Sequence, residues 1–406
     1  MLLLSQLFTH LIHQGTLVIV DARGRRRVFG GRHPGPRCAL RLHTEGLAGR
    51  LLVNPQMALP EGYMQGILTL EEGTLDDLLE IIMVNRKHLN TFLSVRILSA
   101  FLGMLQPFIQ NNSLARARQN VAHHYDTSND IYRLFLDRDM QYSCGYFAHD
   151  DVTLEEAQKA KKEVILRKLA LRDGMKVLEI GCGWGGLAMT LAQRYDLHVT
   201  GVTLSTEQYD LACQRVNEAG LGSRINLQLM DYRALKGRFD RIVSVGMFEH
   251  VGRPHYREFF KKSFELLDDH GVMLLHAIGS KRPLRIAHPW VEKYIFPGGY
   301  IPALSEFLPA VERAGFWVTD LEIWRRHYAL TLRAWKERFR ACREAVITMR
   351  DETFFRMWEM YLAGSEAQFL HGGLMVFHLQ LTKAVGTLPL TRDYMNSASV
   401  PSRKAS

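Results

Sequence analysis

A glycine-rich stretch, VLEIGCGWGG at residues 177–186, has the composition of a ligand-binding turn. Apolar residues surround Glu179, and glycines follow at positions 181, 183, 185 and 186. The apolar run predicts a buried strand, and the glycines predict a tight turn that leads into a helix. Because glycine has no Cβ, its backbone can approach a ligand closely. Gly181, Gly183 and Gly186 match the G-x-G-x-x-G spacing of dinucleotide sites.

The same loop also matches the looser E/D-x-G-x-G-x-G pattern of S-adenosylmethionine (SAM) methyltransferases, with Glu179 as the acid. A dinucleotide site has an acidic residue about 20 positions beyond the glycines, where it binds the ribose. Here the corresponding strand ends at Thr203, which weakens the nicotinamide interpretation and the simplest SAM interpretation alike. Asp231, at the end of a later strand, is placed to hydrogen-bond an adenine amino group, although a surface-turn role is equally open.

These residues must be positioned by alternating strands and helices, which begin near residue 160. We expect strands at 176–180, 198–204, 225–230, 240–246 and 271–278, and helices at 186–194, 206–219 and near 254–267. This alternation indicates βαβ units and a parallel sheet with both faces covered. A ligand then lies at the carboxyl ends of the strands, where the glycines and Asp231 fall.

The N-terminal region has a different pattern. TLVIVDARGRRRVFGG predicts two strands, residues 38–55 show short alternating runs, and EEGTLDDLLEIIMVN predicts a helix capped by Thr74. We therefore expect a small α+β domain at 1–110, a second domain at 111–385 and a polar, frayed tail at 386–406. No stretch has about 18 uninterrupted apolar residues, so we expect no membrane span.

Composition limits the partners of this 406-residue chain. Its net charge of +9 favours an anionic partner, either nucleic acid or a membrane surface, and no nucleic-acid recognition motif appears. Five dispersed cysteines indicate a reducing cytoplasm, and no compact spacing of metal ligands is present. The basic stretch 325–350, with interleaved Trp335, Phe339 and Val346, and the cluster RGRRR at 23–27 are candidates for membrane docking or for ordinary solvated surfaces.

Three further segments carry a family resemblance: QNVAHHYDTSNDIYRLFLDRDMQYSCGYF, VSVGMFEHVG and LLHAIG. Together with VLEIGCGWGG and GVTLSTEQ, they resemble the cyclopropane fatty acid synthase family of SAM-dependent methyltransferases over residues 119–340. The resemblance implies an α/β fold of the class I SAM-dependent methyltransferase type, Rossmann-like, with a mostly parallel seven-stranded sheet. The N-terminal region resembles the extra domain of the phospholipid-modifying bacterial members, so it implies a phospholipid substrate.

The resemblance also implies a reaction and its catalytic residues. Members transfer a methylene from SAM to the cis double bond of an unsaturated acyl chain, through a carbocation that a bound bicarbonate deprotonates. The implied bicarbonate ligands are Cys144, Glu249, His276, the backbone of Ile278, and Tyr328. Tyr125 matches an aromatic residue near the acyl chain, where its ring can stabilise a cation. Glu249 is unusual beside an anion, so we expect it either to orient a donor or to stay protonated.

The implied cofactor residues follow the same motifs. Tyr142 and Ser143 match the amino-acid end of SAM, Gly181 and Gly183 match its backbone contacts, and Thr203, Leu204 and Gln208 match the ribose, with Gln208 in place of the usual acid. Asp231 and Tyr232 match the adenine. By resemblance we further expect a homodimer that associates peripherally with the inner face of the cytoplasmic membrane.

Each residue taken alone has a simpler interpretation. Cys144 could be an inert buried thiol or a covalent nucleophile, His276 and Tyr125 could be core residues, and Glu249 could cap a helix. Three alternative functions also stay open: a methyltransferase that forms methylidene or methyl-branched chains, one that acts on a soluble amine, and a lipid-binding protein without chemistry. The conjunction of the five motifs favours the cyclopropane-forming enzyme.

Overall fold

The computed structural model describes residues 2–89, 128–283 and 288–396. Contacts divide the chain into two compact units. The first unit comprises Met1–Gln106, Arg285–Phe296 and Leu332–Gly373, and the second comprises Pro107–Leu284, Pro297–Thr331 and Leu374–Ser406. The sequence placed segments 285–296 and 332–373 in the second domain, whereas their contacts group them with the N-terminal residues. The expected boundary near residue 110 lies outside the described residues.

The second unit is built on a seven-stranded sheet with the order β10-β11-β9-β8-β5-β6-β7. Neighbouring strands from β9 to β7 run parallel, and β11 and β10 are antiparallel to their neighbours. The strands are β5 (Lys176–Ile180), β6 (His198–Thr203), β7 (Ile225–Leu229), β8 (Phe239–Val245), β9 (Leu267–Ser280), β10 (Trp317–Trp324) and β11 (Leu374–Thr382). This order confirms the fold of a class I methyltransferase. Four of the five expected strands lie within one residue of their predicted limits, and β9 begins four residues earlier and ends two residues later than predicted.

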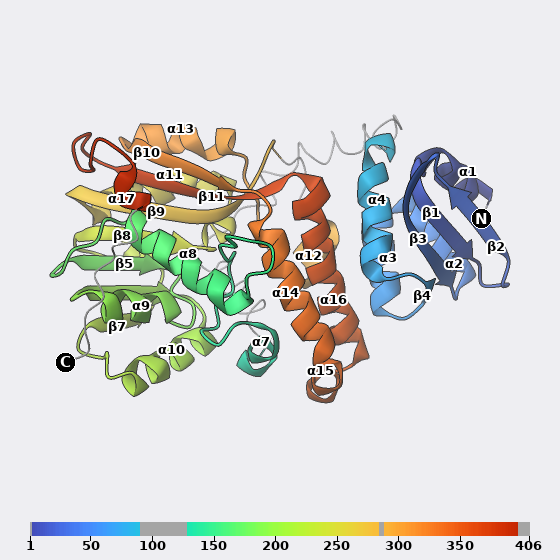
Figure 1. Cartoon of the computed structure of the whole chain (residues 1–406), viewed down its shortest axis with the longest axis horizontal. Coiled ribbons are helices and arrows are strands. Elements are labelled where there is room, and N and C mark those ends of the chain that lie inside the picture. The colour runs from blue at the N-terminus through green and yellow to red at the C-terminus, as the bar shows by residue number, and fades with distance from the viewer. Residues whose placement is uncertain (1, 90–127, 284–287, 397–406) are drawn as a thin grey trace. The chain divides into compact units, whose positions relative to one another are not determined.

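Helices cover both faces of this sheet (Figure 1). The helices of this unit are α7 (Asn129–Phe135), α8 (Leu154–Lys168), α9 (Gly186–Arg194), α10 (Thr206–Glu218), α11 (Tyr256–Leu266), α13 (Leu304–Ala314) and α17 (Asp393–Asn396), with short 3₁₀ turns η1 (Tyr232–Ala234), η2 (Phe248–His250) and η3 (Arg253–His255). A capping box fixes the start of α8, where Thr153 Oγ1 accepts from the Glu156 N–H and Glu156 accepts from the Thr153 N–H.

Alternation along the strands produces two separate cores. Leu178 of β5 and Met273 of β9 pack with α11 and α13 on one face. Val177 and Leu274, one residue away on the same strands, pack with α8, α9 and α10 on the other. Successive strand residues point to opposite faces of the sheet, so neighbouring residues of one strand pack against different helices.

The first unit contains a four-stranded sheet with the order β2-β1-β3-β4, in which β1 and β3 are parallel. Its elements up to residue 89 are α1 (Leu2–Leu11), β1 (Gln14–Val20), β2 (Arg26–Gly30), β3 (His33–Leu42), α2 (Glu45–Val53), α3 (Pro55–Met64), β4 (Leu68–Glu72) and α4 (Leu75–Leu89). Thr74 caps α4 as expected, because its Oγ1 accepts from the Asp77 N–H at 3.1 Å. The alternating runs expected at 38–55 end at Leu42, and the helices α2 and α3 follow.

The later segments of the first unit are helical: α12 (Pro289–Tyr294), the greater part of α14 (His327–Ala341), α15 (Arg343–Met349), α16 (Glu352–Ala367) and η4 (Gln368–Gly372). The helices α14 and α15 contain most of the basic stretch 325–350, for which membrane docking and an ordinary solvated surface were both open. Trp335, Phe339 and Val346 are fully buried rather than presented to a membrane. Arg333 and Lys336 both pair with Glu366, at 2.9 and 2.5 Å. The apolar face of this stretch therefore forms a core, and much of its charge is neutralised within the unit.

The other basic cluster, RGRRR at residues 23–27, also forms ion pairs. Arg23 contacts Glu45 at 2.7 Å and Arg25 contacts Asp21 at 2.8 Å, with both arginines more than half exposed.

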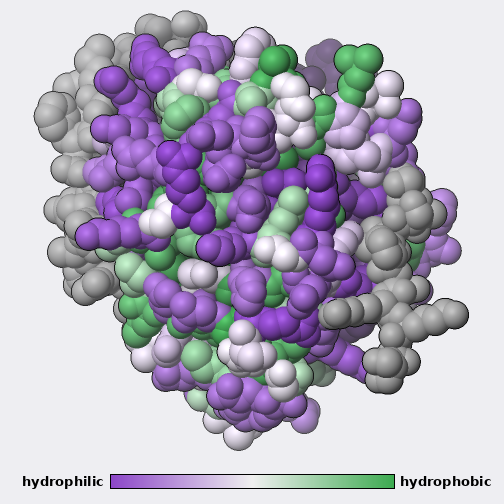
Figure 2. Space-filling view, turned by 90° about the vertical axis from the view of Figure 1, so that its left-hand side faces the viewer, coloured by the Kyte–Doolittle hydropathy of each residue, from purple (hydrophilic) through white to green (hydrophobic). Residues whose placement is uncertain are grey.

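Figure 2 shows that hydrophilic side chains cover most of the face it presents, and hydrophobic residues appear there in small patches. Within the described residues, no helix combines the length and apolar character needed to cross a membrane.

The predicted tail is partly ordered. Residues up to Asn396 are described, and Met395 of α17 is buried. The Tyr394 hydroxyl bonds to Gln380 of β11, which anchors this segment to the second unit. The frayed tail that the sequence predicted therefore does not begin at residue 386. All five cysteines lie within the described residues, and none forms a disulfide.

Candidate functional site

The glycine loop joins β5 to α9 at the carboxyl edge of the large sheet. Gly181, Gly183 and Gly185 have φ angles of +85°, +52° and +78°, a region that residues with a Cβ rarely adopt. A Cβ on Gly186 would lie 2.4 Å from the Gln141 side chain. The glycines are therefore required both by the turn and by the close approach of the 139–143 segment.

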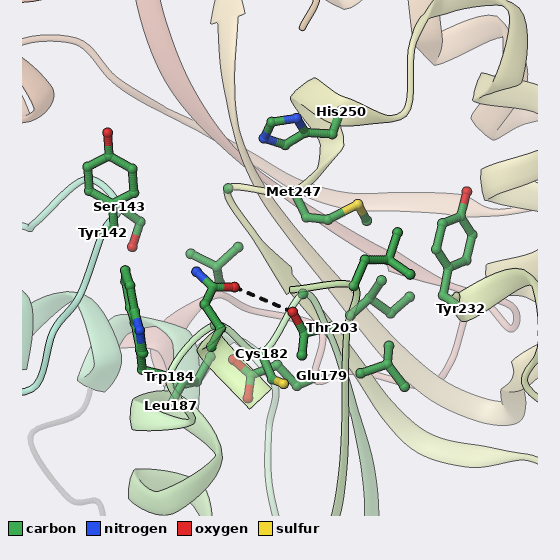
Figure 3. Close-up of a pocket in the computed structure, with 18 of the residues that line it drawn as sticks. Tyr142, Ser143, Glu179, Cys182, Trp184, Leu187, Thr203, Tyr232, Met247 and His250 are labelled. Carbon is green, nitrogen blue, oxygen red and sulfur yellow. Dashed lines mark hydrogen bonds between the residues drawn. The ribbon is translucent and has the colours of Figure 1, made fainter. Parts of the chain in front are cut away.

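A pocket opens beside this loop, at the carboxyl ends of β5, β6, β7 and β8 (Figure 3). Its lining includes every residue that the sequence assigned to the cofactor: Tyr142, Ser143, Gly181, Gly183, Thr203, Leu204, Gln208, Asp231 and Tyr232. Figure 3 shows Tyr142 and Trp184 on one side of the pocket and Tyr232 on the opposite side. The structure therefore brings the nine residues together, and their individual contacts with SAM stay predictions.

Polar side chains occupy the position near the ribose where the sequence lacks the usual acid. The Thr203 hydroxyl donates to Gln208 Oε1 at 3.4 Å, the dashed line in Figure 3. Gln208 is buried in the first turn of α10, whose N-cap Ser205 accepts from the Gln208 N–H at 3.2 Å. An amide and a hydroxyl held in this way can donate to and accept from a ribose without a carboxylate.

The adenine side of the pocket is more constrained than the sequence indicated. Asp231 caps η1, and its two carboxylate oxygens accept from Arg233, at 2.9 Å from Nε and 2.7 Å from a terminal nitrogen. Lone pairs remain on both oxygens, so an amino group can still donate to them. The ring of Tyr232 packs edge-on against Phe259, with 5.4 Å between centroids.

Two buried ionisable groups of opposite sign line the pocket. Lys161 Nζ donates to Gln141 Oε1 and Ser143 Oγ, both at 2.7 Å, and burial lowers the pKa of Lys161 to about 8. Burial raises the pKa of Glu179 to about 8, and its Oε2 has no hydrogen-bond partner in the described chain. A ligand that carries both an ammonium and a carboxylate, as the amino-acid end of SAM does, complements such a pair. The residues present therefore fit SAM.

Sequence reasoning missed several pocket residues. Trp184 lies inside the glycine loop itself, and its Nε1 donates to Asn129 Oδ1 at 2.7 Å. Met247 and His250 also line the pocket, and burial lowers the pKa of His250 to about 4. The signal for Trp184 was available, because a large aromatic residue between turn glycines has little other use. Nothing in the sequence distinguished Met247.

The predicted anion ligands lie outside this pocket lining, and hydrogen bonds bring only part of the set together. The N–H of Ile278 donates to Glu249 Oε1 at 2.5 Å. Glu249 therefore accepts from the N–H that was expected to serve the anion, and the role of the Ile278 backbone toward an anion stays a prediction. Burial raises the pKa of Glu249 to about 7, and its Oε2 is buried without a hydrogen-bond partner among the described residues.

His276 lies two residues before Ile278 on the same face of β9. Its Nδ1 is 2.6 Å from Nε2 of His378, a residue of β11 that the sequence analysis did not single out. Burial lowers the pKa of both imidazoles well below the usual range. We call Glu249, His276, Ile278 and His378 the β9 cluster. A histidine within the apolar run LMVFHLQL was the available signal for His378.

Cys144 is fully buried, and its thiol donates to the Gly145 carbonyl at 3.3 Å. Burial raises the pKa of Cys144 well above its usual range, so the thiolate needed for covalent attack is disfavoured. The Gly145 N–H donates to Thr331 Oγ1 at 3.0 Å, which ties this loop to the start of α14. Among the described residues, no group of three or more potential metal ligands converges on one point.

Of the two remaining predicted site residues, the structure describes only one. Tyr328 is buried in the first turn of α14, close in sequence to Thr331 and therefore to the Cys144 loop. Tyr125 lies outside the described residues. Their roles stay predictions.

Comparison with known proteins places this geometry in a family. The model of the mycolic acid cyclopropane synthetase family matches residues 112–379, well over half of the chain. The chain belongs to that family. It is 42% identical over 262 residues to the cyclopropane-fatty-acyl-phospholipid synthase of Escherichia coli strain K12, a match that covers 64% of this chain and 67% of the relative.

Two further members support the assignment. The tuberculostearic acid methyltransferase UfaA1 of Mycobacterium tuberculosis is 36% identical over 361 residues, which covers 84% of this chain and 82% of the relative. The crystal structure of the mycolic acid cyclopropane synthase CmaA1, complexed with SAH and CTAB, is similar with a TM-score of 0.62 and 36% identity. This likeness covers 65% of the chain and 97% of that structure.

Membership of the family establishes the reaction class. The chain is a SAM-dependent methyltransferase, and the family transfers a methylene group from SAM to lipids. The pocket at the glycine loop, lined by the buried Lys161 and Glu179, is where this fold places SAM.

Proposed function

We propose that this chain is a cyclopropane-fatty-acyl-phospholipid synthase, which converts the cis double bond of a phospholipid acyl chain into a cyclopropane ring. The family supports the methylene transfer, and the name of the Escherichia coli relative supports a phospholipid as the acceptor. The observation that carries the catalytic part is Glu249, a buried carboxyl whose second oxygen lacks a partner in the described chain.

The chemistry explains why such a group is needed. An isolated alkene is a weak nucleophile, so the donor must be strongly electrophilic, as a sulfonium is. Methyl transfer leaves a carbocation on the acyl chain, and ring closure requires the loss of one proton from the new methyl group. Water must be excluded, because it would trap the cation. Bicarbonate, when bound, would supply the base for that proton.

The residues of the β9 cluster fit this anion in part. Bicarbonate carries one hydroxyl donor, and Glu249 Oε2 is a buried acceptor that needs one. A neutral His276 can donate from its ring, and the Tyr328 hydroxyl is a further donor on the same unit, whereas the single S–H of Cys144 already donates to the Gly145 carbonyl. The Ile278 N–H, already used by Glu249, does not add a free donor. Glu249 therefore acts as the acceptor for the anion's hydroxyl and positions the Ile278 backbone.

A second product is supported by one relative. The match to the tuberculostearic acid methyltransferase extends over more of this chain than the match to the Escherichia coli enzyme. From the same cation, a 1,2-hydride shift followed by loss of a proton from the methyl group gives a methylidene chain, and a separate hydride donor would have to reduce that chain to give a saturated methyl branch. The reaction product therefore distinguishes the two candidates.

The test is a product analysis on the purified full-length chain. The protein is incubated with SAM and vesicles of an anionic phospholipid that bears cis-monounsaturated chains, and the fatty acids are then analysed. A mass gain of one CH₂ with upfield cyclopropane proton signals supports the proposal. Vinylidene or branched-methyl signals would favour the second product. Equal activity on free unsaturated fatty acid would contradict the phospholipid assignment.

The membrane itself is also a proposed partner, with docking driven by charge. The two basic stretches singled out in the sequence are largely ion-paired within the first unit, so we expect only a modest electrostatic contribution. A homodimer at the cytoplasmic face of the membrane stays a proposal from family resemblance alone.

A further inference from the structure

His378 lies directly opposite His276 in the large sheet. Strand β11 runs antiparallel to β9, and their register pairs the two histidines. Both side chains point toward the face that α8, α9 and α10 cover, because Phe377 and Leu379 belong to the other core. The imidazoles are at most 2% exposed, and their nitrogens meet at 2.6 Å. The contact is therefore shielded from water and fixed by the strand pairing.

A hydrogen bond between two neutral imidazoles has two possible directions. Either His276 donates its Nδ1–H to His378 Nε2, or His378 donates its Nε2–H to His276 Nδ1. Each neutral imidazole has only one N–H proton. The direction of this bond therefore also decides whether the second nitrogen of each ring, Nε2 of His276 and Nδ1 of His378, carries a proton. The direction therefore determines whether His276 presents a donor or an acceptor at Nε2.

The surroundings of His378 favour one direction. Its Nδ1 is buried and has no hydrogen-bond partner in the described residues. The nearest ring, that of Trp324, is inclined by only 31° at 4.0 Å, so an N–H in the imidazole plane would not point into the indole face. If His276 donated, His378 would have to carry a proton on this Nδ1. Buried N–H groups without an acceptor are rarer than unused lone pairs, so this arrangement is the less favourable one.

We propose that His378 is a positioning residue that fixes His276 in the tautomer with its proton on Nε2. His276 then presents an N–H donor, which is the group an anion requires. The inference rests on the proposed function for the role of that donor. The contact that sets the tautomer stands on the register and on the hydrogen bond alone.

A merely structural role for His378 makes a different prediction. As a buried strand residue it fills space next to Trp324, and any replacement of similar size would then be tolerated. A positioning role requires a donor near the former Nε2. Glutamine carries an amide nitrogen that can reach this position, whereas methionine has comparable length and no donor. The pair of variants therefore separates the two roles.

The direct test is nitrogen-15 NMR of the full-length chain labelled at histidine. Signals of His276 and His378 are assigned by comparison with His276→Gln and His378→Gln. We expect the chemical shifts of His276 to show a protonated Nε2 and an unprotonated Nδ1. A proton on Nδ1 of His276 would overturn the proposal. This measurement needs neither lipid nor bicarbonate, and it uses the wild-type chain as its main sample.

The functional test compares turnover of His378→Met and His378→Gln. We expect His378→Met to lose about 10–100-fold in turnover, the range typical of residues that orient a ligand through a second side chain. His378→Gln should stay within a few-fold of the wild type, and SAM affinity should be unchanged in both. Equal turnover in the two variants would overturn the proposal.

Gln380 provides a matched control on the same strand and the same face. It is fully buried, and its amide donates to the Lys168 carbonyl and to the Tyr394 hydroxyl, not to His276. Gln380→Met should lower the melting temperature and leave turnover unchanged. A loss of turnover in Gln380→Met as large as in His378→Met would show that packing alone is responsible.

The two proposals fail in distinguishable ways. A wild-type chain that binds SAM and forms no cyclopropane, yet shows His276 protonated on Nε2, contradicts only the proposed function. A chain that forms cyclopropane with His276 protonated on Nδ1 contradicts only the role of His378.

Discussion

The SAM pocket and the β9 cluster lie in the same unit but are assembled in different ways. Most of the pocket is formed by short loops that follow strands β5, β6, β7 and β8, and the segment 140–143 and helix α8 complete it. The β9 cluster depends on contacts between distant segments, and 102 residues separate His276 from His378. Ligand binding in this fold is thus encoded locally, whereas the orientation of the catalytic donors depends on strand register.

The electrostatics of the two regions differ as well. The pocket contains an amine and a carboxyl, Lys161 and Glu179, whose pKa values burial brings to about 8, and a zwitterionic cofactor offers an opposite charge to each of them. The β9 cluster contains two imidazoles that burial keeps neutral and one carboxyl, Glu249, with a pKa of about 7. A region without fixed positive charge binds a small anion through hydrogen bonds rather than through ion pairing. Changes in the two regions should therefore affect different steps.

The largest effect is expected from Glu249→Gln. This change replaces one of the two carboxylate oxygens by an NH₂ donor, which disrupts the acceptor for the anion's hydroxyl, so turnover should fall by about 100-fold. SAM affinity, measured by calorimetry, should be unchanged because Glu249 does not line the pocket. Glu265→Gln, on the exposed side of α11, is the matched control and should behave as the wild type. Wild-type turnover in Glu249→Gln would remove this residue from the site.

The reciprocal effect is expected from Lys161→Met. Loss of the ammonium removes two hydrogen bonds that hold Gln141 and Ser143, so SAM affinity should fall about 10-fold or more. Turnover at saturating SAM should fall much less than in Glu249→Gln. Lys159→Met, at an exposed position of the same helix, is the control. A large loss of turnover at saturating SAM, with unchanged SAM affinity, would contradict the assignment of binding and catalysis to separate regions.

Glu179→Gln should change the pH dependence of stability. Burial raises the pKa of Glu179 from 4.5 to about 8 in the folded chain, so its proton is retained there while the unfolded chain releases it. The contribution of Glu179 is present in full below pH 4.5 and is lost as the pH rises toward 8, by about 1.4 kcal/mol per pH unit.

Glutamine does not titrate, so the variant without SAM should gain stability relative to the wild type between pH 5 and 8. Thermal unfolding at several pH values, in the absence of SAM, measures this difference. A constant difference across the range would show that Glu179 is ionised throughout.

The smallest effect is expected from Cys144→Ser. The thiol is buried with a raised pKa, so it acts as a weak donor that a hydroxyl can replace. Turnover should fall by a few-fold, and SAM affinity should be unchanged. Complete loss of turnover in a variant with a normal melting temperature would instead support a covalent role for the sulfur.

Sequence alone predicted the large sheet and the pocket because both depend on local patterns. The limits of β5 and α9 were predicted residue for residue, since apolar runs and turn glycines define them. All nine cofactor residues line one pocket, and most of them do so because in a parallel sheet the strand ends meet at one edge. For the basic stretch 325–350, the sequence could not show that acids such as Glu366 neutralise part of its charge. Charge spacing along the chain does not show which acids lie nearby in space.

Composition and motif order thus determined the fold class, the family and the cofactor loop, since these follow from residues that are neighbours in the chain. Only the tertiary structure showed that Glu249 takes up the Ile278 N–H, and only the pairing of β11 with β9 brought His378 to His276. The reason is physical. The direction of a hydrogen bond depends on what both partners and their neighbours already donate and accept, and strand pairing brings those neighbours from distant parts of the sequence.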